Sequence, residues 1–127
     1  MKKVLIGILA IPLFLILLEI FGIIINHAST GIQTNRLRRD IEDAFPNTEI
    51  ISVESLTGNT TGTGNHVDCQ TCITFTSDLS LSEVQDKLSK TYEWNDLRCY
   101  VNETDTRGEY LFFLRTTAPF PNNIEGH

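Results

Sequence analysis

Apolar residues are concentrated in one run near the start of the chain. From Val4 to Ile25 the only charged or polar residue is Glu19. With a rise of about 1.5 Å per residue, a helix of this length crosses a hydrocarbon core about 30 Å thick. We therefore predict that residues 1–25 form a transmembrane signal anchor. The remaining chain is too polar to enter a bilayer and is expected to form a domain at one membrane face.

A cleaved secretory signal is the competing interpretation of this run, because Lys2 and Lys3 precede it. The run is roughly twice as long as the usual apolar region of a signal peptide. The nearest candidate cleavage site, Asn26-His27-Ala28, has an unfavourable Asn at its first position. Both features favour an anchor that is retained in the mature protein.

The orientation in the membrane is set by a close balance of positive charges. Lys2 and Lys3 lie on one side of the run, and Arg36, Arg38 and Arg39 lie on the other. Long domains are translocated largely regardless of their charge. We therefore expect a single-pass protein of the cell membrane with its N-terminus inside and its domain outside.

Helical periodicity returns after a polar segment, residues 26–33, that we predict to be a linker. Leu37, Ile41, Ala44 and Phe45 fall on one stripe of a helix that starts at residue 34, and Pro46 ends it. A second helix is predicted from residue 81 to about 90. Ser80 and Glu83 have the spacing of a capping box at its start.

Alternating apolar and polar residues predict four strands. They cover residues 49–56, 66–76, 97–102 and 109–117. In the first strand, Ile51 and Val53 are expected to share a face. The order α-β-β-α-β-β over residues 34–117 predicts an α+β domain, with a four-stranded, mainly antiparallel sheet and two helices on one face. Residues 118–127 are expected to form an irregular tail.

The charge of the domain limits its partners. The chain has 127 residues and a formal net charge of −6. From residue 34 onward, 8 Lys and Arg stand against 15 Asp and Glu, which gives −7. Because an acidic surface repels phosphate groups, we expect neither nucleic acid nor anionic headgroups as partners.

The three cysteines lie on predicted strands. Cys69 and Cys99 alternate with apolar residues and are expected on the buried face, whereas Cys72 falls on the polar face. A Cys69–Cys99 disulfide and two buried thiols in neighbouring strands are both compatible with this pattern, and Cys72 is then a free thiol. Residues three apart on a strand point to opposite faces, which argues against a redox Cys69/Cys72 pair.

A zinc site would need His66 to join the three cysteines. The strand pattern through residues 66–76 argues against such convergence, so we expect no metal and no cofactor.

Two further features are candidates for binding. A glycine-rich stretch that joins two predicted strands is a candidate binding loop, although it lacks the lysine and spacing of a phosphate-binding loop. Its residues are Gly58, Asn59, Gly62, Gly64, Asn65 and His66. Glu19 is the second candidate, because a carboxylate within a membrane helix usually has a partner.

No motif in the sequence indicates catalysis. We expect a membrane-anchored, non-catalytic binding or interaction module with a protein partner. The alternatives are a thiol-disulfide oxidoreductase that uses Cys69 and Cys72, and an accessory subunit of a membrane complex that packs through Glu19.

Overall fold

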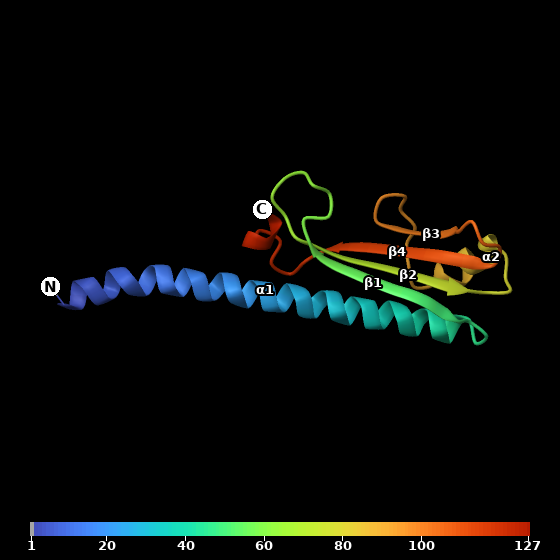
Figure 1. Ribbon diagram of the computed structural model, residues 1–127, viewed down its shortest axis with the longest axis horizontal. Helices are drawn as coiled ribbons and strands as arrows, with labels where there is room; N and C mark the ends of the chain where they lie inside the picture. The colour runs from blue at the N-terminus through green and yellow to red at the C-terminus, as the bar shows by residue number, and fades with distance from the viewer. Residues whose placement is uncertain (1) are drawn as a thin grey trace.

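The computed structural model describes residues 2–127 and has an α+β fold. A long helix, α1 (Lys2–Ala44), precedes strands β1 (Ile50–Gly58) and β2 (Asp68–Thr76). A short helix, α2 (Leu81–Leu88), separates these from strands β3 (Cys99–Glu103) and β4 (Glu109–Thr117), and a single turn of 3₁₀ helix, η1 (Ile124–Gly126), follows. The first half of α1 projects from the domain, and its second half lies along the sheet (Figure 1).

Helix α1 is continuous through residues 26–33, where the sequence predicted a linker. The segment contains no proline, and its polar side chains find partners on the sheet. The Thr30 and Thr57 hydroxyls lie 2.6 Å apart, and Gln33 Nε2 donates to the Cys69 carbonyl. A hydrophobic pattern alone does not detect a helix face that packs through hydrogen bonds, so this segment reads as a linker in the sequence.

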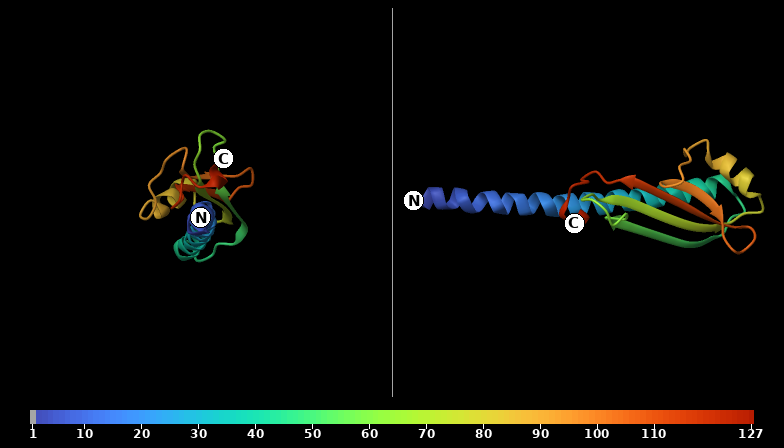
Figure 2. Two further views of the ribbon diagram at one scale, coloured as in Figure 1. Left: turned by 90° about the vertical axis from the view of Figure 1, so that its left-hand side faces the viewer. Right: turned by 90° about the horizontal axis from the view of Figure 1, so that it is seen from above.

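The four strands form one antiparallel sheet in the order β1-β2-β4-β3. Ile73 pairs with Phe112, which in turn pairs with Val101 on β3. Both helices lie on the same face of the sheet (Figure 2), as the sequence predicted, and their apolar side chains join its core cluster.

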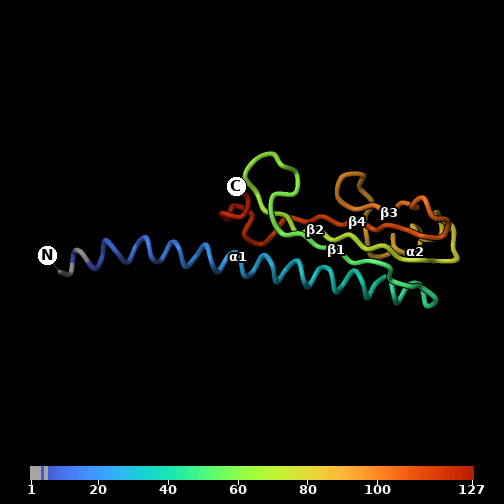
Figure 3. The backbone as a smooth tube through the Cα atoms, viewed as in Figure 1, coloured from blue at the N-terminus to red at the C-terminus, as the bar shows by residue number. Residues whose placement is uncertain are grey.

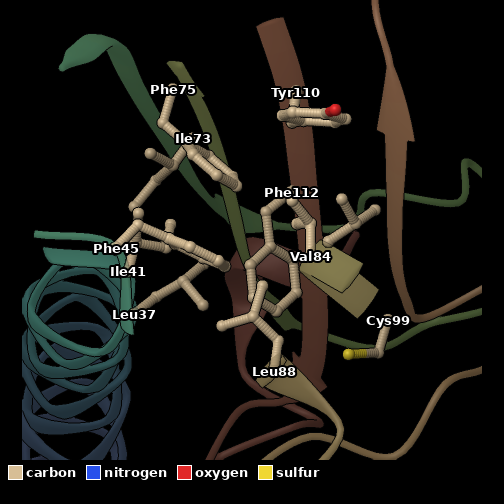
Figure 4. Close-up of a cluster of buried hydrophobic side chains, with 11 residues drawn as sticks. Leu37, Ile41, Phe45, Ile73, Phe75, Val84, Leu88, Cys99, Tyr110 and Phe112 are labelled. Atoms are coloured by element: carbon tan, nitrogen blue, oxygen red, sulfur yellow. The ribbon is translucent and has the colours of Figure 1, made fainter. Parts of the chain in front are cut away.

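The hydrophobic core lies between the sheet and the two helices (Figure 4). Helix α1 contributes Leu37 and Ile41, and Phe45 follows directly after its end. Helix α2 contributes Val84 and Leu88. The Leu37, Ile41 and Phe45 side chains are at most 3% exposed, which confirms the apolar stripe predicted for the second half of α1.

Strand β1 departs from simple alternation near its start. Ile50 pairs with Phe75 and Ser52 pairs with Thr74, which leaves Ile51 as an extra, unpaired residue. The register puts Ile50 opposite Phe75 and Val53 opposite Ile73, both on the helix side, and so interrupts the simple alternation that the sequence predicted. A bulge depends on the partner strand, and the alternation of one strand does not reveal it.

Residues 118–127 have little regular structure, as expected, yet they pack against the rest of the chain. Two backbone hydrogen bonds join the segment to Val67: Ala118 N donates to the Val67 carbonyl, and Val67 N donates to the Pro121 carbonyl. The segment then turns back toward the middle of α1 (Figure 3). We call residues 118–127 the C-terminal segment.

Helix α2 begins with the predicted capping box. Ser80 Oγ accepts a hydrogen bond from the Glu83 amide at 3.4 Å, and the Ser80 amide donates to Glu83 Oε2 at 2.9 Å. Hydrogen bonds from the Ser80 backbone and then from its side chain lower the pKa of the Glu83 carboxyl group.

We predict that Ser80→Ala lowers the free energy of unfolding by about 0.5 to 2 kcal/mol, because it removes the acceptor for the Glu83 amide. Urea unfolding of the full chain in a mild non-ionic detergent measures the change. Ser82→Ala is the matched control, because Ser82 is exposed in the first turn of the same helix. Equal effects of the two substitutions would contradict the role of the cap.

The effect of Ser80→Ala should also depend on pH. The folded-state pKa of Glu83 is lowered, so the stabilisation that this carboxylate supplies is present above its ordinary value of 4.5 and is lost as the pH falls through the folded-state value. The difference between the parent protein and Ser80→Ala should therefore shrink at acidic pH, which the same unfolding experiment records.

Candidate functional site

The face of the sheet opposite the helices is the largest regular surface of the domain. We call it the outer face. The strand register places on it Ser52, Glu54, Leu56, Gln70, Cys72, Thr74, Tyr100, Asn102, Leu111, Phe113 and Arg115. All of these side chains are half-buried or exposed. Since α1 and α2 both pack on the other side, the outer face is available to a partner.

An aromatic pair lies on the outer face beside the β3 edge of the sheet. Tyr100 on β3 lies directly opposite Phe113 on β4, and their rings stack with centroids 4.9 Å apart and planes 15° from parallel. Cys72 and then Glu54 continue the same row across β2 and β1. This row combines a flat apolar area with one carboxylate at its edge, a composition suited to contact with another protein.

The edge of the sheet beside this row is also exposed. Strand β1 pairs only with β2, and its Ile51, Val53 and Leu56 side chains are 49%, 39% and 51% exposed. Such an edge carries unpaired backbone groups, and the bulge at Ile51 together with the Glu54 charge limits uncontrolled pairing with other strands.

The cysteines occupy the two faces of the sheet. Cys69 and Cys99 lie on the helix side with 2% and 6% exposure, and Cys72 lies on the outer face. All three are free thiols. Of the two alternatives that the sequence left open, the structure has buried thiols and no Cys69–Cys99 disulfide, because strand β4 lies between β2 and β3. Two strand spacings amount to about 9 to 10 Å, whereas a disulfide needs Cα atoms within about 7 Å.

The environment of the thiols does not favour redox chemistry. Burial raises the pKa of the Cys99 thiol to about 11. Burial, and to a smaller extent the Glu54 carboxylate, raises the pKa of the Cys72 thiol. A reactive thiol needs a lowered pKa instead. Cys69 and Cys72 also point to opposite faces of β2, so they do not converge with His66 on a metal ion, and residues 2–127 contain no cluster of three potential metal ligands.

The glycine-rich loop is closed by its own side chains. Asn59 Oδ1 accepts from the Gly62 amide at 2.9 Å, and Asn59 Nδ2 donates to the Gly64 carbonyl and to the Gly126 carbonyl. Gly62 and Gly64 both have φ of +70°, a left-handed conformation that favours glycine. The Gly62 amide is thus already engaged within the loop.

His66 and Asn65, the last two residues of this loop, contact other parts of the chain. His66 Nε2 lies 3.0 Å from Asp68 Oδ2, and Asn65 contacts the His127 ring. The buried Asp68 carboxylate also accepts from the Thr60 hydroxyl at 2.8 Å. These contacts fix the loop beside the C-terminal segment.

The C-terminal segment binds α1 through three positions of the helix, one helical turn apart. Asn26 accepts from the Phe120 amide at 2.9 Å and donates to the Phe120 carbonyl at 3.0 Å. Gly22 leaves room for Asn123, because a Cβ atom there would lie 2.6 Å from Asn123 Nδ2. Glu19 accepts from the Ile124 amide at 2.9 Å. We call this set of contacts the clasp.

The clasp gives Glu19 a partner within its own chain. The sequence suggested an intramembrane contact with another protein, whereas the Glu19 carboxylate binds a backbone amide of the C-terminal segment. Asn26 was missed by sequence reasoning. Its position on the helical stripe that continues through Thr30, Leu37 and Ile41 is the signal that could have identified it.

A hollow of about 650 Å³ lies between the start of α2 and the turn that joins β3 to β4. Two of the three carboxylates that line it are engaged: Glu83 in the capping box, and Glu103 with the Gly108 amide at 2.9 Å. The third, Asp78, is exposed.

No protein-family model matches the chain, and no curated protein or solved structure is significantly similar to it. The function of the chain is therefore inferred from its own geometry.

We predict that Cys72 is the only one of the three thiols to react with a bulky maleimide in the native state. Peptide mapping after labelling identifies the site. Glu54→Gln should speed the labelling of Cys72 near neutral pH, because removing the carboxylate lowers the thiol pKa. Asp86→Asn on α2, across the sheet, is the matched control and should leave the rate unchanged. Fastest labelling at Cys69 would contradict the assignment of faces.

We predict that Asn26→Ala lowers the free energy of unfolding by about 1 to 3 kcal/mol, because it leaves backbone groups of Phe120 without partners at a buried position. Asn35→Ala is the matched control, since Asn35 is exposed on the same helix. Urea unfolding in detergent measures both. A loss no larger for Asn26→Ala than for Asn35→Ala would show that the clasp does not stabilise the fold.

Proposed function

We propose that this protein is a membrane-anchored, non-catalytic interaction module whose extracytoplasmic domain binds a second membrane-anchored protein through the outer face of its sheet. The uncovered outer face, with the stacked Tyr100–Phe113 pair on β3 and β4, is the observation that carries the proposal. Aromatic side chains are enriched at protein interfaces because they bury a large area with few rotatable bonds.

The anchor supports the choice of partner. Helix α1 has an apolar N-terminal half that is long enough to span a membrane, which is consistent with a single-pass membrane protein. The second half of the same helix is built into the domain through Asn26, Leu37 and Ile41. Because no flexible linker separates the two halves, the outer face is held at a fixed height and orientation, which favours partners in the same membrane.

The chemistry of the side chains supports binding over catalysis. In the 650 Å³ hollow, the Ser80 hydroxyl donates to the Glu83 carboxylate at 2.7 Å, and this pair is the cap of α2. Of the ionisable groups with raised pKa, Tyr92 and Tyr110 are engaged in the core by Asp40 and by the Leu79 carbonyl. The thiol pKa of Cys72 is raised, which opposes its use as a thiolate.

Photo-crosslinking in intact membranes tests this proposal. With p-benzoylphenylalanine in place of Leu56 or Tyr100, on two different strands of the outer face, we expect adducts of the same discrete mass. The probe in place of Asp86, on the exposed side of α2, should give none. Identical adducts from all three positions, or none from the outer face, would contradict the proposal.

A charge substitution provides the matched control. Thr74→Arg places a long cation on the outer face and should reduce the crosslinking yield several-fold. Ser82→Arg places the same side chain on α2 and should leave the yield unchanged.

A further inference from the structure

The clasp restricts where a membrane can begin. It places peptide groups and polar side chains, including Asn123 and Glu125, along one side of α1 from Glu19 to Asn26. Irregular backbone does not face the hydrocarbon core of a bilayer, because its polar groups would lack partners there. The core must therefore end on the N-terminal side of Glu19.

The apolar helix that remains can span a thinned bilayer. From Val4 to Leu18 it has 15 residues, and at about 1.5 Å each they measure about 22 Å. This length lies just below the usual range for transmembrane helices, and reorientation of the flanking Lys2 and Lys3 together with local thinning of the bilayer accommodates such a helix at modest cost. The side chains described on this part of the helix are all exposed in the isolated chain.

The clasp also carries an apolar surface at the same level. Phe120 is 40% exposed and Ile124 is 60% exposed, although both belong to a segment whose backbone is firmly bound. The Phe120 ring packs edge-on against Phe21 of α1, with centroids 5.9 Å apart, and Phe21 is 52% exposed. The three side chains thus continue the apolar surface of the spanning helix outward onto the domain.

We propose that Phe21, Phe120 and Ile124 form an interfacial anchor, which enters the headgroup region of a zwitterionic phospholipid bilayer and places the membrane boundary at Glu19. Side chains of this kind on a polar scaffold bury themselves at the boundary between headgroups and acyl chains. Glu19 and Glu125 lie beside the anchor, and the chain has a net charge of −6, so an anionic surface would be repelled. The inference depends on the membrane anchoring proposed above and is independent of the outer face.

The test uses the full chain in phosphatidylcholine vesicles. An environment-sensitive NBD label is placed at Ile124→Cys in a Cys72→Ser background, where the two remaining native thiols are buried. We expect a blue-shifted emission and strong quenching by lipids that carry a spin label at the headgroup or shallow in the acyl chain. The same label at Asp105→Cys, in the turn between β3 and β4, should be quenched only by aqueous iodide.

A pair of glycine variants tests the part played by the clasp. Gly22→Val, in the presence of the label at residue 124, should displace the C-terminal segment and abolish most of the lipid quenching. Gly31→Val is the matched control, because a Cβ atom at Gly31 meets no atom within 4 Å, and quenching should persist.

Three outcomes would overturn the inference. The first is a vesicle-bound chain whose label at residue 124 responds to iodide and not to lipid spin labels, which leaves the anchoring intact. The second is quenching that requires phosphatidylserine in the vesicles, which excludes a zwitterionic surface. The third is failure of the chain to float with vesicles, which overturns the anchoring as well.

Discussion

The structure depends on the packing of one helix in two different surroundings. The side chains described in the first half of α1 are apolar, except for Glu19, and suit a bilayer. The second half of the helix buries only one stripe of side chains against the sheet. Leu37, Ile41 and Phe45 lie on that stripe, and α1 packs against β1 and β2 whereas α2 packs against β3. The candidate membrane-spanning helix is therefore also part of the core of the domain.

Hydrogen bonds determine how α1 is rotated and where it lies along the sheet. Apolar contacts are not directional, so a purely hydrophobic stripe tolerates small shifts. The polar side chains on the same side of α1 do not tolerate such shifts. Asn26 binds both backbone groups of Phe120, and Gln33 binds β2 while accepting from Thr116 on β4. An error in rotation would leave several buried polar groups unpaired, at a cost of about 1 to 3 kcal/mol each.

This rigid connection gives the surfaces of the domain a defined relation to the membrane. The clasp lies at the level of Glu19, and strand β2 begins next to it at Asp68. The sheet therefore extends away from the proposed membrane boundary, with the outer face running along its length. A flexible linker would let the domain adopt many orientations relative to the membrane. Because α1 is continuous, Tyr100 and Phe113 are presented in one orientation to a partner held in the same membrane.

Local patterns in the sequence determined several features correctly. Strand β4 matches its predicted limits of 109–117, and Ser80 and Glu83 form the capping box. The separation of Cys72 from Cys69 and Cys99 also follows from alternation alone. Each of these features depends on residues within a few positions of one another, where backbone geometry leaves few choices.

Tertiary structure decided the features that depend on distant residues. The placement of β4 between β2 and β3 separates Cys69 from Cys99, although alternation alone correctly put both on one face. The helical state of residues 26–33 and the clasp at Glu19 depend on partners up to 105 positions away, as in the bond from Ile124 to Glu19. Periodicity reports which residues avoid water, and it carries no information on which polar groups pair across the fold. The candidate membrane-spanning run and most of the secondary structure could therefore be predicted from the sequence, whereas the packing of α1 against the C-terminal segment could not.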